Sequence, residues 1–130
     1  LRKLNLGNIK IYNRVFNLDK DIIYEYLQML DLSGITVNLN LNSSLNKAFY
    51  LSNLKLSNCD IENIETSLNL AQFNYLNFLD LSFNKISVIK SGLFKLNNNF
   101  QTLNLSNNRI FFIAENSFDK ITYLNLAWNN

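Results

Sequence analysis

The 130-residue sequence contains no histidine and no proline, and it has only three glycines and one cysteine, Cys59. Without histidine the chain cannot form Ser-His or Cys-His nucleophile pairs or imidazole metal sites. A single cysteine cannot close an internal disulfide or supply a thiolate cluster. The glycines are too far apart in the sequence for a glycine-rich phosphate-binding loop. We therefore expect no enzymatic activity, no cofactor and no metal ion.

An excess of one charge sign is also missing. Twelve Lys and Arg against ten Asp and Glu give a net charge of +2, and like charges never occur in runs longer than two residues. This distribution lacks the basic patch that is typical of nucleic-acid-binding proteins, so no nucleic-acid partner is evident. The apolar content of 48% and charged content of 17% are typical of a globular chain. The uninterrupted apolar runs are too short for a signal peptide or a membrane-spanning helix.

Leucine and asparagine are abundant, with 24 and 25 copies, and the leucines repeat. The pattern L-x-x-L-x-L begins at residues 1, 27, 51, 76, 100 and 121, with spacings of 26, 24, 25, 24 and 21 residues. Positions 1, 4 and 6 of these units are apolar in all 18 cases, and 16 of them are leucine. Such a period indicates a solenoid whose units stack on one another.

Two further positions of the unit carry a signature. Its ninth residue is Cys59, Asn84, Asn108 and Asn129 in the last four units, and its nineteenth is Phe94 and Phe118 in two of them. With these residues the chain resembles the leucine-rich repeat family, in its Phe-containing class of about 24 residues, as in Toll and Toll-like receptor ectodomains. The resemblance implies an α/β solenoid of horseshoe type, with a parallel concave β-sheet and a mostly irregular convex side.

The alternation in L-x-L supports the same fold on physical grounds. Successive side chains of a strand point to opposite faces, so the leucines point inward and the residues between them point outward. One unit is too small to bury its leucines, and neighbouring units therefore share a continuous core. The ninth residue lies where the chain turns, and an inward Asn amide there can pair with buried backbone groups. We expect Cys59 to occupy the same buried row, as a weaker substitute.

We expect one array over residues 1–130, built from about six units. Neither end carries the polar or cysteine-rich cap that closes such arrays, so we expect an uncapped fragment of a longer protein. The first two units deviate, because Ile9 and Ile35 occupy the ninth position. The sequence also predicts a short helix over 17–28 and a convex-side strand over 37–42.

The outward positions 3, 5, 7 and 8 of each unit should form the concave face. Exposed aromatic side chains on a rigid sheet are typical interface anchors. The candidate ligand-binding residues on this face are Asp31, Lys55, Phe78, Asp80, Phe83, Tyr123, Asn125 and Trp128. Phe78 and Tyr123 stand at position 3 and should face solvent. Phe83 and Trp128 stand at position 8, where they either contact a ligand or merely cover the strand ends.

Two sequons provide candidate N-glycosylation sites, at Asn42 and Asn104. Asn42 is the better acceptor, because a glycan on Asn104 would block the concave face. Glu62 and Glu65 are not expected to act as a catalytic acid pair, because their positions lie on the edge or convex side with no cleft around them.

The favoured function is non-catalytic recognition of a protein or other macromolecular ligand by the concave face. The family resemblance implies the ectodomain of a receptor, Toll-like or otherwise innate-immune, or of an adhesion protein, at the cell surface or outside the cell. Membrane contact would come only through other parts of the parent chain, and the parent could dimerise. The alternatives are a secreted leucine-rich immune factor and an intracellular leucine-rich repeat scaffold.

Overall fold

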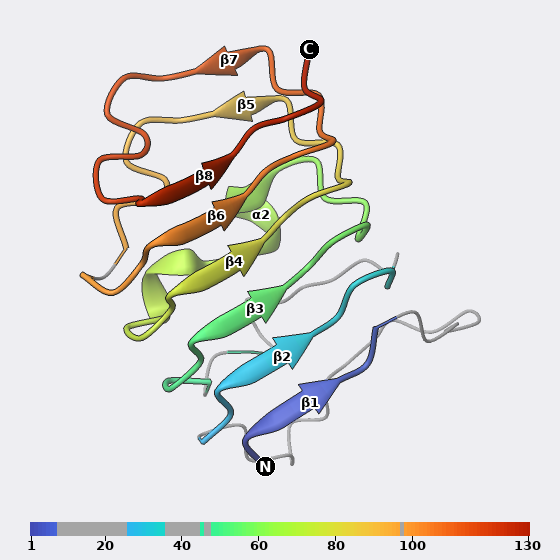
Figure 1. Cartoon of the computed structure of the whole chain (residues 1–130), viewed down its shortest axis with the longest axis vertical. Helices are drawn as coiled ribbons and strands as arrows, with labels where there is room; N and C mark the ends of the chain where they lie inside the picture. The colour runs from blue at the N-terminus through green and yellow to red at the C-terminus, as the bar shows by residue number, and fades with distance from the viewer. Residues whose placement is uncertain (8–25, 36–44, 46–47, 97) are drawn as a thin grey trace.

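The computed structural model describes residues 1–7, 26–35, 45, 48–96 and 98–130. Its main element is a six-stranded parallel sheet in the order β1-β2-β3-β4-β6-β8 (Figure 1). The strands are β1 (Lys3–Asn5), β2 (Met29–Asp31), β3 (Asn53–Lys55), β4 (Phe78–Asp80), β6 (Thr102–Asn104) and β8 (Tyr123–Asn125). Each strand covers positions 3–5 of a repeat unit, and each pairs with the next unit without a shift of register.

The alternation of leucine with other residues determines which side of this sheet is buried. The central leucine is completely buried in the four inner strands, whereas the two residues flanking it are half-buried. Leucines at positions 1 and 6 join the same core, as Leu27 and Leu32 show. The apolar side chains of all units therefore form one continuous core behind the sheet.

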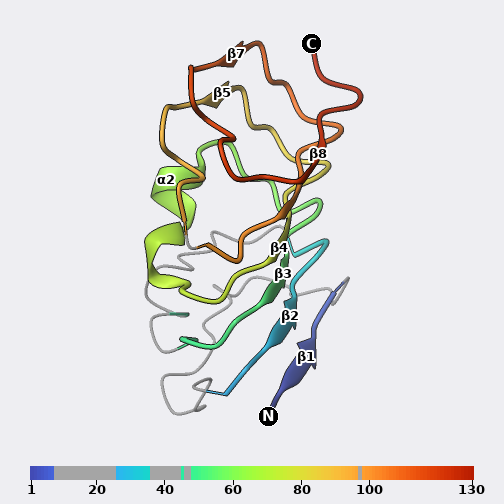
Figure 2. The same ribbon diagram turned by 60° about the vertical axis from the view of Figure 1, so that its left-hand side comes forward.

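The convex side carries a second set of elements, which lie opposite the six-stranded sheet (Figure 2). They are helix α2 (Ile64–Ser67), the 3-10 helix η1 (Leu70–Gln72), and strands β5 (Val88–Ile89) and β7 (Phe112–Ile113), which pair in parallel. Asn63 caps α2, because its side-chain oxygen accepts the N–H groups of Glu65 and Thr66. Inside the convex turns, Phe94 stacks on Phe118 with 5.9 Å between ring centroids.

The fold class expected from the sequence is confirmed: the protein is a parallel α/β solenoid whose repeat units each add one strand to the concave sheet. The predicted helix over 17–28 is wrong for residues 26–28, which are not helical, and residues 17–25 lie outside the described part of the chain. The predicted strand over 37–42 and the deviating Ile9 also lie outside it. Ile35, the other deviating residue, is buried and packs into the core.

Candidate recognition surface

Asn84 connects the turns of two neighbouring units from inside the solenoid. Its Oδ1 accepts the backbone N–H groups of Cys59 and Ile61, both at 3.0 Å. Its Nδ2 donates to three carbonyl oxygens, those of Leu56, Leu81 and Ser82, at 2.8, 3.0 and 3.1 Å. One side chain thus serves five backbone groups, and two of its acceptors belong to its own unit.

The same arrangement recurs one unit further along the chain. Asn108 accepts the N–H of Ile86 and donates to Leu81, Leu105 and Ser106. Asn129 accepts the N–H of Ile110 and donates to Leu105 and Leu126. Asn84 and Asn108 are buried, and Asn129 is half-buried. The carbonyl of Leu105 therefore receives a donor from its own unit and one from the next.

Cys59 occupies the equivalent position in the third unit. Its thiol is buried and donates to the carbonyl oxygen of Leu32 at 3.2 Å. Burial raises the pKa of the Cys59 thiol to about 11, from an ordinary value of 9.0. The neutral thiol is a weak nucleophile, so the site is a structural one without the thiolate that a reactive cysteine needs.

The eighth residue of every unit from the second to the sixth has a left-handed backbone. The φ angles are 78° at Gly34, 55° at Asn58, 55° at Phe83, 54° at Asn107 and 58° at Trp128. Glycine and asparagine adopt this conformation readily, whereas a bulky side chain in it is a strained exception. The turn that ends each strand thus imposes an unfavourable conformation on two aromatic residues.

Packing does not compensate this strain at the two aromatic positions. Phe83 is 58% exposed and Trp128 is 82% exposed. Phe83 has a repeat unit on each side, so the interpretation in which its ring merely covers the strand ends does not describe it, whereas Trp128 has a described unit on one side only. Strained residues that are kept without a packing advantage are concentrated at ligand-binding sites. Both belong to the surface that extends from the C-terminal ends of β4 and β8.

The two aromatic residues at position 3 differ from each other. Phe78 lies in β4 between Asn53 of β3 and Thr102 of β6, and is half-buried by these neighbours. Tyr123 is exposed in β8, which pairs with β6 on one side and has no described strand on the other. Phe78 thus offers part of a ring within the sheet, and Tyr123 offers most of its side chain.

The fifth position of the units has a structural role that the sequence analysis missed. Its side-chain oxygen accepts the backbone N–H two residues later in five of the six units, at 2.9–3.1 Å. The acceptors are Asn5, Asp31, Asp80, Asn104 and Asn125. This short turn stabilises the chain as it leaves the strand. The recurrence of Asn or Asp at this position was the signal in the sequence.

Lys55 stands at the fifth position of the third unit, where the other five units have Asn or Asp. It is in register with Asp31 on one side and with Asp80 on the other. Its ammonium group nevertheless forms no ion pair within the described ranges of the chain, where Lys85, Lys90 and Lys95 each do so. Lys55 thus places one cationic group between two carboxylates at the centre of the concave face.

Of the two sequon asparagines, the structure describes only Asn104. Asn104 lies in β6 on the concave face, half-buried, and its Oδ1 accepts hydrogen bonds from both the N–H and the hydroxyl of Ser106. The oxygen of its side-chain amide is therefore engaged in the turn at the end of the strand. Asn42 lies outside the described residues.

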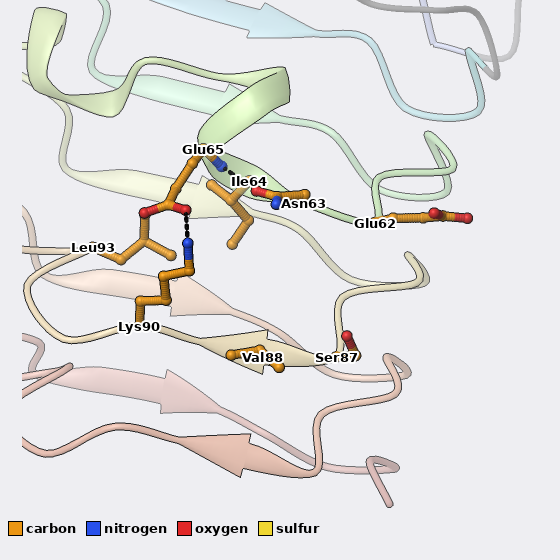
Figure 3. Close-up of a pocket in the computed structure, with 8 residues that line it drawn as sticks. All are labelled: Glu62, Asn63, Ile64, Glu65, Ser87, Val88, Lys90 and Leu93. Atoms are coloured by element: carbon orange, nitrogen blue, oxygen red, sulfur yellow. Dashed lines mark hydrogen bonds and ion pairs between the residues drawn. The ribbon is translucent and has the colours of Figure 1, made fainter.

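A small cavity lies on the convex side, so the expectation that no cleft surrounds Glu62 and Glu65 is wrong. It has a volume of about 260 Å³. Its lining residues are Glu62, Asn63, Ile64, Glu65, Ser87, Val88, Lys90 and Leu93. Figure 3 shows Glu62 pointing away from Glu65, whose carboxylate pairs with Lys90. The two carboxylates thus do not converge as an acid and base would.

An exposed row of tyrosines is the feature that sequence reasoning overlooked entirely. Tyr26, Tyr50 and Tyr75 stack on one another just before β2, β3 and β4. Each directly precedes the first leucine of a unit, at intervals of 24 and 25 residues. This recurrence could have been found by extending the unit by one residue toward its N-terminal side.

Within the part of the chain that the structure describes, no three His, Cys, Asp or Glu side chains group closely enough to hold a metal ion. A search of the same residues finds no helix with the length and apolar character needed to cross a membrane.

Comparison with known proteins agrees with this geometry. Residues 74–130 match the leucine rich repeat family. No curated protein sequence matches the chain, but ten chains of solved structures do. One is the crystal structure of a TLR13–ssRNA13 complex, with a TM-score of 0.64 and 32% sequence identity over 82% of this chain. The protein spans about 15% of the length of that Toll-like receptor chain. The chain belongs to the leucine-rich repeat family.

Proposed function

We propose that the protein recognises a macromolecular ligand with its concave face, as part of a receptor ectodomain in innate immunity, and that it catalyses no reaction. The candidate contact residues are Asp31, Lys55, Phe78, Asp80, Phe83, Tyr123, Asn125 and Trp128. The structural similarity to a Toll-like receptor supports a position outside the cell or in an endosome. We further propose that the six units act as one continuous array.

The observation that carries this proposal is the combination of a left-handed backbone and an exposed ring at Phe83. The residue lies within the array, with Asn58 and Asn107 at the same position of the units on either side. Both neighbours are suited to the left-handed turn, and Phe83 is not. Its ring is largely exposed, so folding gains little from it. A ligand that covers the ring would bury it and gain binding energy from it, since aromatic side chains supply much of the binding energy at interfaces.

The charge of the face favours a protein ligand. Lys55 between Asp31 and Asp80 gives a row of alternating sign, which suits the mixed charges of a protein surface. A nucleic acid instead requires several cationic groups that follow the phosphates. The chain carries a net charge of only +2.

One finding favours a second candidate, single-stranded RNA. The TLR13 structure is a complex with ssRNA13. Exposed aromatic residues such as Phe83, Tyr123 and Trp128 could stack on unpaired bases, and stacking of this kind tolerates any base sequence. Binding measurements can separate the two candidates because RNA binding falls steeply with salt concentration.

The test is a binding screen with the immobilised chain, against purified extracellular proteins and single-stranded RNA oligonucleotides. A protein that binds should lose at least tenfold in affinity when Phe83→Asn is introduced, since removing an anchor of this kind costs about 2 kcal/mol. Phe111→Ala, which alters an exposed ring beside β7 on the convex side, is the matched control and should bind normally.

Each result of the screen has a defined meaning. Salt-sensitive RNA binding that depends on Phe83 would replace the protein ligand by the second candidate. Equal affinity of the Phe83 variant and the original chain would refute the concave site. An antibody to a tagged parent protein should label intact cells or endosomes. Labelling confined to the cytoplasm would favour the scaffold alternative.

A further inference from the structure

Three tyrosine rings from successive units lie face to face along one side of the solenoid. Tyr26 and Tyr50 have ring centroids 6.1 Å apart and an interplanar angle of 10°. Tyr50 and Tyr75 have centroids 5.3 Å apart and an angle of 21°. These values lie within the range of offset aromatic stacking. Tyr50 and Tyr75 are therefore the closer of the two pairs.

Backbone hydrogen bonds hold this closer pair in position. The N–H groups of Asn77 and Phe78 both donate to the carbonyl oxygen of Ser52, at 2.8 and 3.0 Å. Tyr50 lies two residues before Ser52, and Tyr75 lies two residues before Asn77. The two tyrosines thus occupy equal positions of adjacent units, and parallel strands are spaced by only about 4.8 Å.

Both rings are open to solvent, with exposed fractions of 45% for Tyr50 and 51% for Tyr75. They stand three residues before β3 and β4, at the N-terminal ends of these strands (Figure 1). Phe83 follows the C-terminal end of β4, on the other side of the sheet. A reagent can therefore reach the tyrosine pair without contact with the proposed ligand site.

Cysteine cannot join the units of this chain to one another. Cys59 is the single cysteine of the sequence and its thiol is buried, so a disulfide between two units is excluded. Two phenol rings offer a different covalent route, because the ring carbons beside their hydroxyl groups can bond after each ring has lost an electron. The rings must lie close together and be accessible to an oxidant, and Tyr50 and Tyr75 meet both conditions.

We propose that Tyr50 and Tyr75 form an oxidative modification site, at which a dityrosine bond joins the third unit to the fourth. A one-electron oxidant, the class that includes the activated states of haem peroxidases, removes one electron from each phenol, and each hydroxyl proton passes to water. The two phenoxyl radicals form a carbon–carbon bond between the ring positions next to their oxygens. The hydrogens of these two carbons then move to the oxygens and restore both phenols.

Each cross-link thus gives two electrons to the oxidant and two protons to water. The bond closes a loop of the chain from Tyr50 to Tyr75, and a cross-link of this kind stabilises a fold mainly by restricting the unfolded chain. The oxidised chain should therefore unfold at a urea concentration about 1 M higher than the untreated chain. This inference does not depend on the proposed function.

The first experiment exposes the full chain to a photoexcited ruthenium complex, with persulfate as the final electron acceptor. Dityrosine fluorescence and mass spectrometry of the digested monomer should show Tyr50 joined to Tyr75, with the loss of two hydrogen atoms. Tyr50→Phe keeps the stacked ring without the phenol, so the yield should fall at least tenfold. Tyr26→Phe removes the more distant phenol and should keep most of the yield. Far-UV circular dichroism checks that each variant remains folded.

Tyr123 provides the matched control for simple exposure. It is 62% exposed, and no ring stacks on it among the described residues. Tyr123→Phe should therefore leave the yield of the cross-link unchanged. The second experiment repeats urea unfolding after oxidation, and Tyr50→Phe treated in the same way should show no shift of its midpoint.

A chain that forms no dityrosine under these conditions would overturn the proposal. Cross-links that join only separate chains, or that involve Tyr123 as often as Tyr50, would overturn it as well. Equal losses of yield in Tyr26→Phe and Tyr50→Phe would contradict the choice of the closer pair. Ligand binding can be measured on the same oxidised sample, so this proposal and the proposed function can fail separately.

Discussion

The backbone N–H of Cys59 donates to the side-chain oxygen of Asn84 at 3.0 Å, across 25 residues of sequence. This bond joins the turn of one repeat unit to the inward side chain of the next. Asn84 also donates to carbonyl oxygens of both units. Its side-chain amide therefore links the backbones of two neighbouring units inside an otherwise apolar core. The stability of the solenoid should therefore depend strongly on the Asn84 side chain.

Replacing Asn84 by leucine should lower the free energy of unfolding by about 3 kcal/mol or more, since each buried backbone group left without a partner costs about 1–3 kcal/mol. Asn129→Leu should cost less, because Asn129 is half-buried and serves three backbone groups instead of five. Urea unfolding followed by circular dichroism measures both. Equal costs for the two variants would mean that burial does not govern this row.

Phe83→Asn should make the protein more stable while it weakens ligand binding. Asparagine adopts the left-handed backbone more easily, and relief of the strain should contribute about 1 kcal/mol. Phe78→Asn is the control, since Phe78 is half-buried in β4 with extended backbone, and its loss should destabilise the fold. Thermal unfolding distinguishes the pair. A clear fall in the melting temperature of Phe83→Asn would contradict the strain argument.

Two substitutions of Asp80 should separate its two roles. Asp80 accepts the N–H of Ser82 at 2.9 Å and carries a negative charge beside Lys55. Asp80→Asn keeps an oxygen acceptor, as Asn104 and Asn125 show in other units, so the melting temperature should hardly change. Asp80→Ala should cost about 1 kcal/mol through loss of the turn hydrogen bond. If ligand binding responds to both variants alike, the charge of Asp80 contributes to recognition.

The thiol of Cys59 should be protected from reagents in the folded protein. At pH 8 a disulfide reagent such as Ellman's should react slowly with the native chain and fast in urea, because the pKa of Cys59 is raised to about 11 by burial. Rapid labelling of the native chain would contradict the buried position.

The same pKa predicts a pH dependence of stability. The unfolded thiol ionises at the lower pKa, near 9.0, so the contribution of Cys59 is complete below pH 9 and is lost between pH 9 and about 11. The stability difference between the original chain and Cys59→Ala should therefore narrow across this interval. Urea titrations at several pH values test this, and a difference that stays constant would exclude the linkage.

The sequence alone determined the concave strands and their register. The leucines at positions 1, 4 and 6 recur with the period of the unit, and burying them requires adjacent units to stack with equal positions side by side. The inward ninth residue follows from the same repetition. The local pattern is sufficient here because every unit packs against its neighbour in the same way.

Only the tertiary structure decided which polar and aromatic residues are available to a partner. The side-chain oxygens of Asp31 and Asp80 each accept a backbone hydrogen bond in a turn. Phe83 is exposed on a strained backbone, which the alternation of leucines in the sequence does not predict. The stack of Tyr26, Tyr50 and Tyr75 exists because three units place their rings at successive levels of one side. Exposure and stacking depend on where neighbouring units lie in space, whereas the leucine period specifies only which side chains point inward.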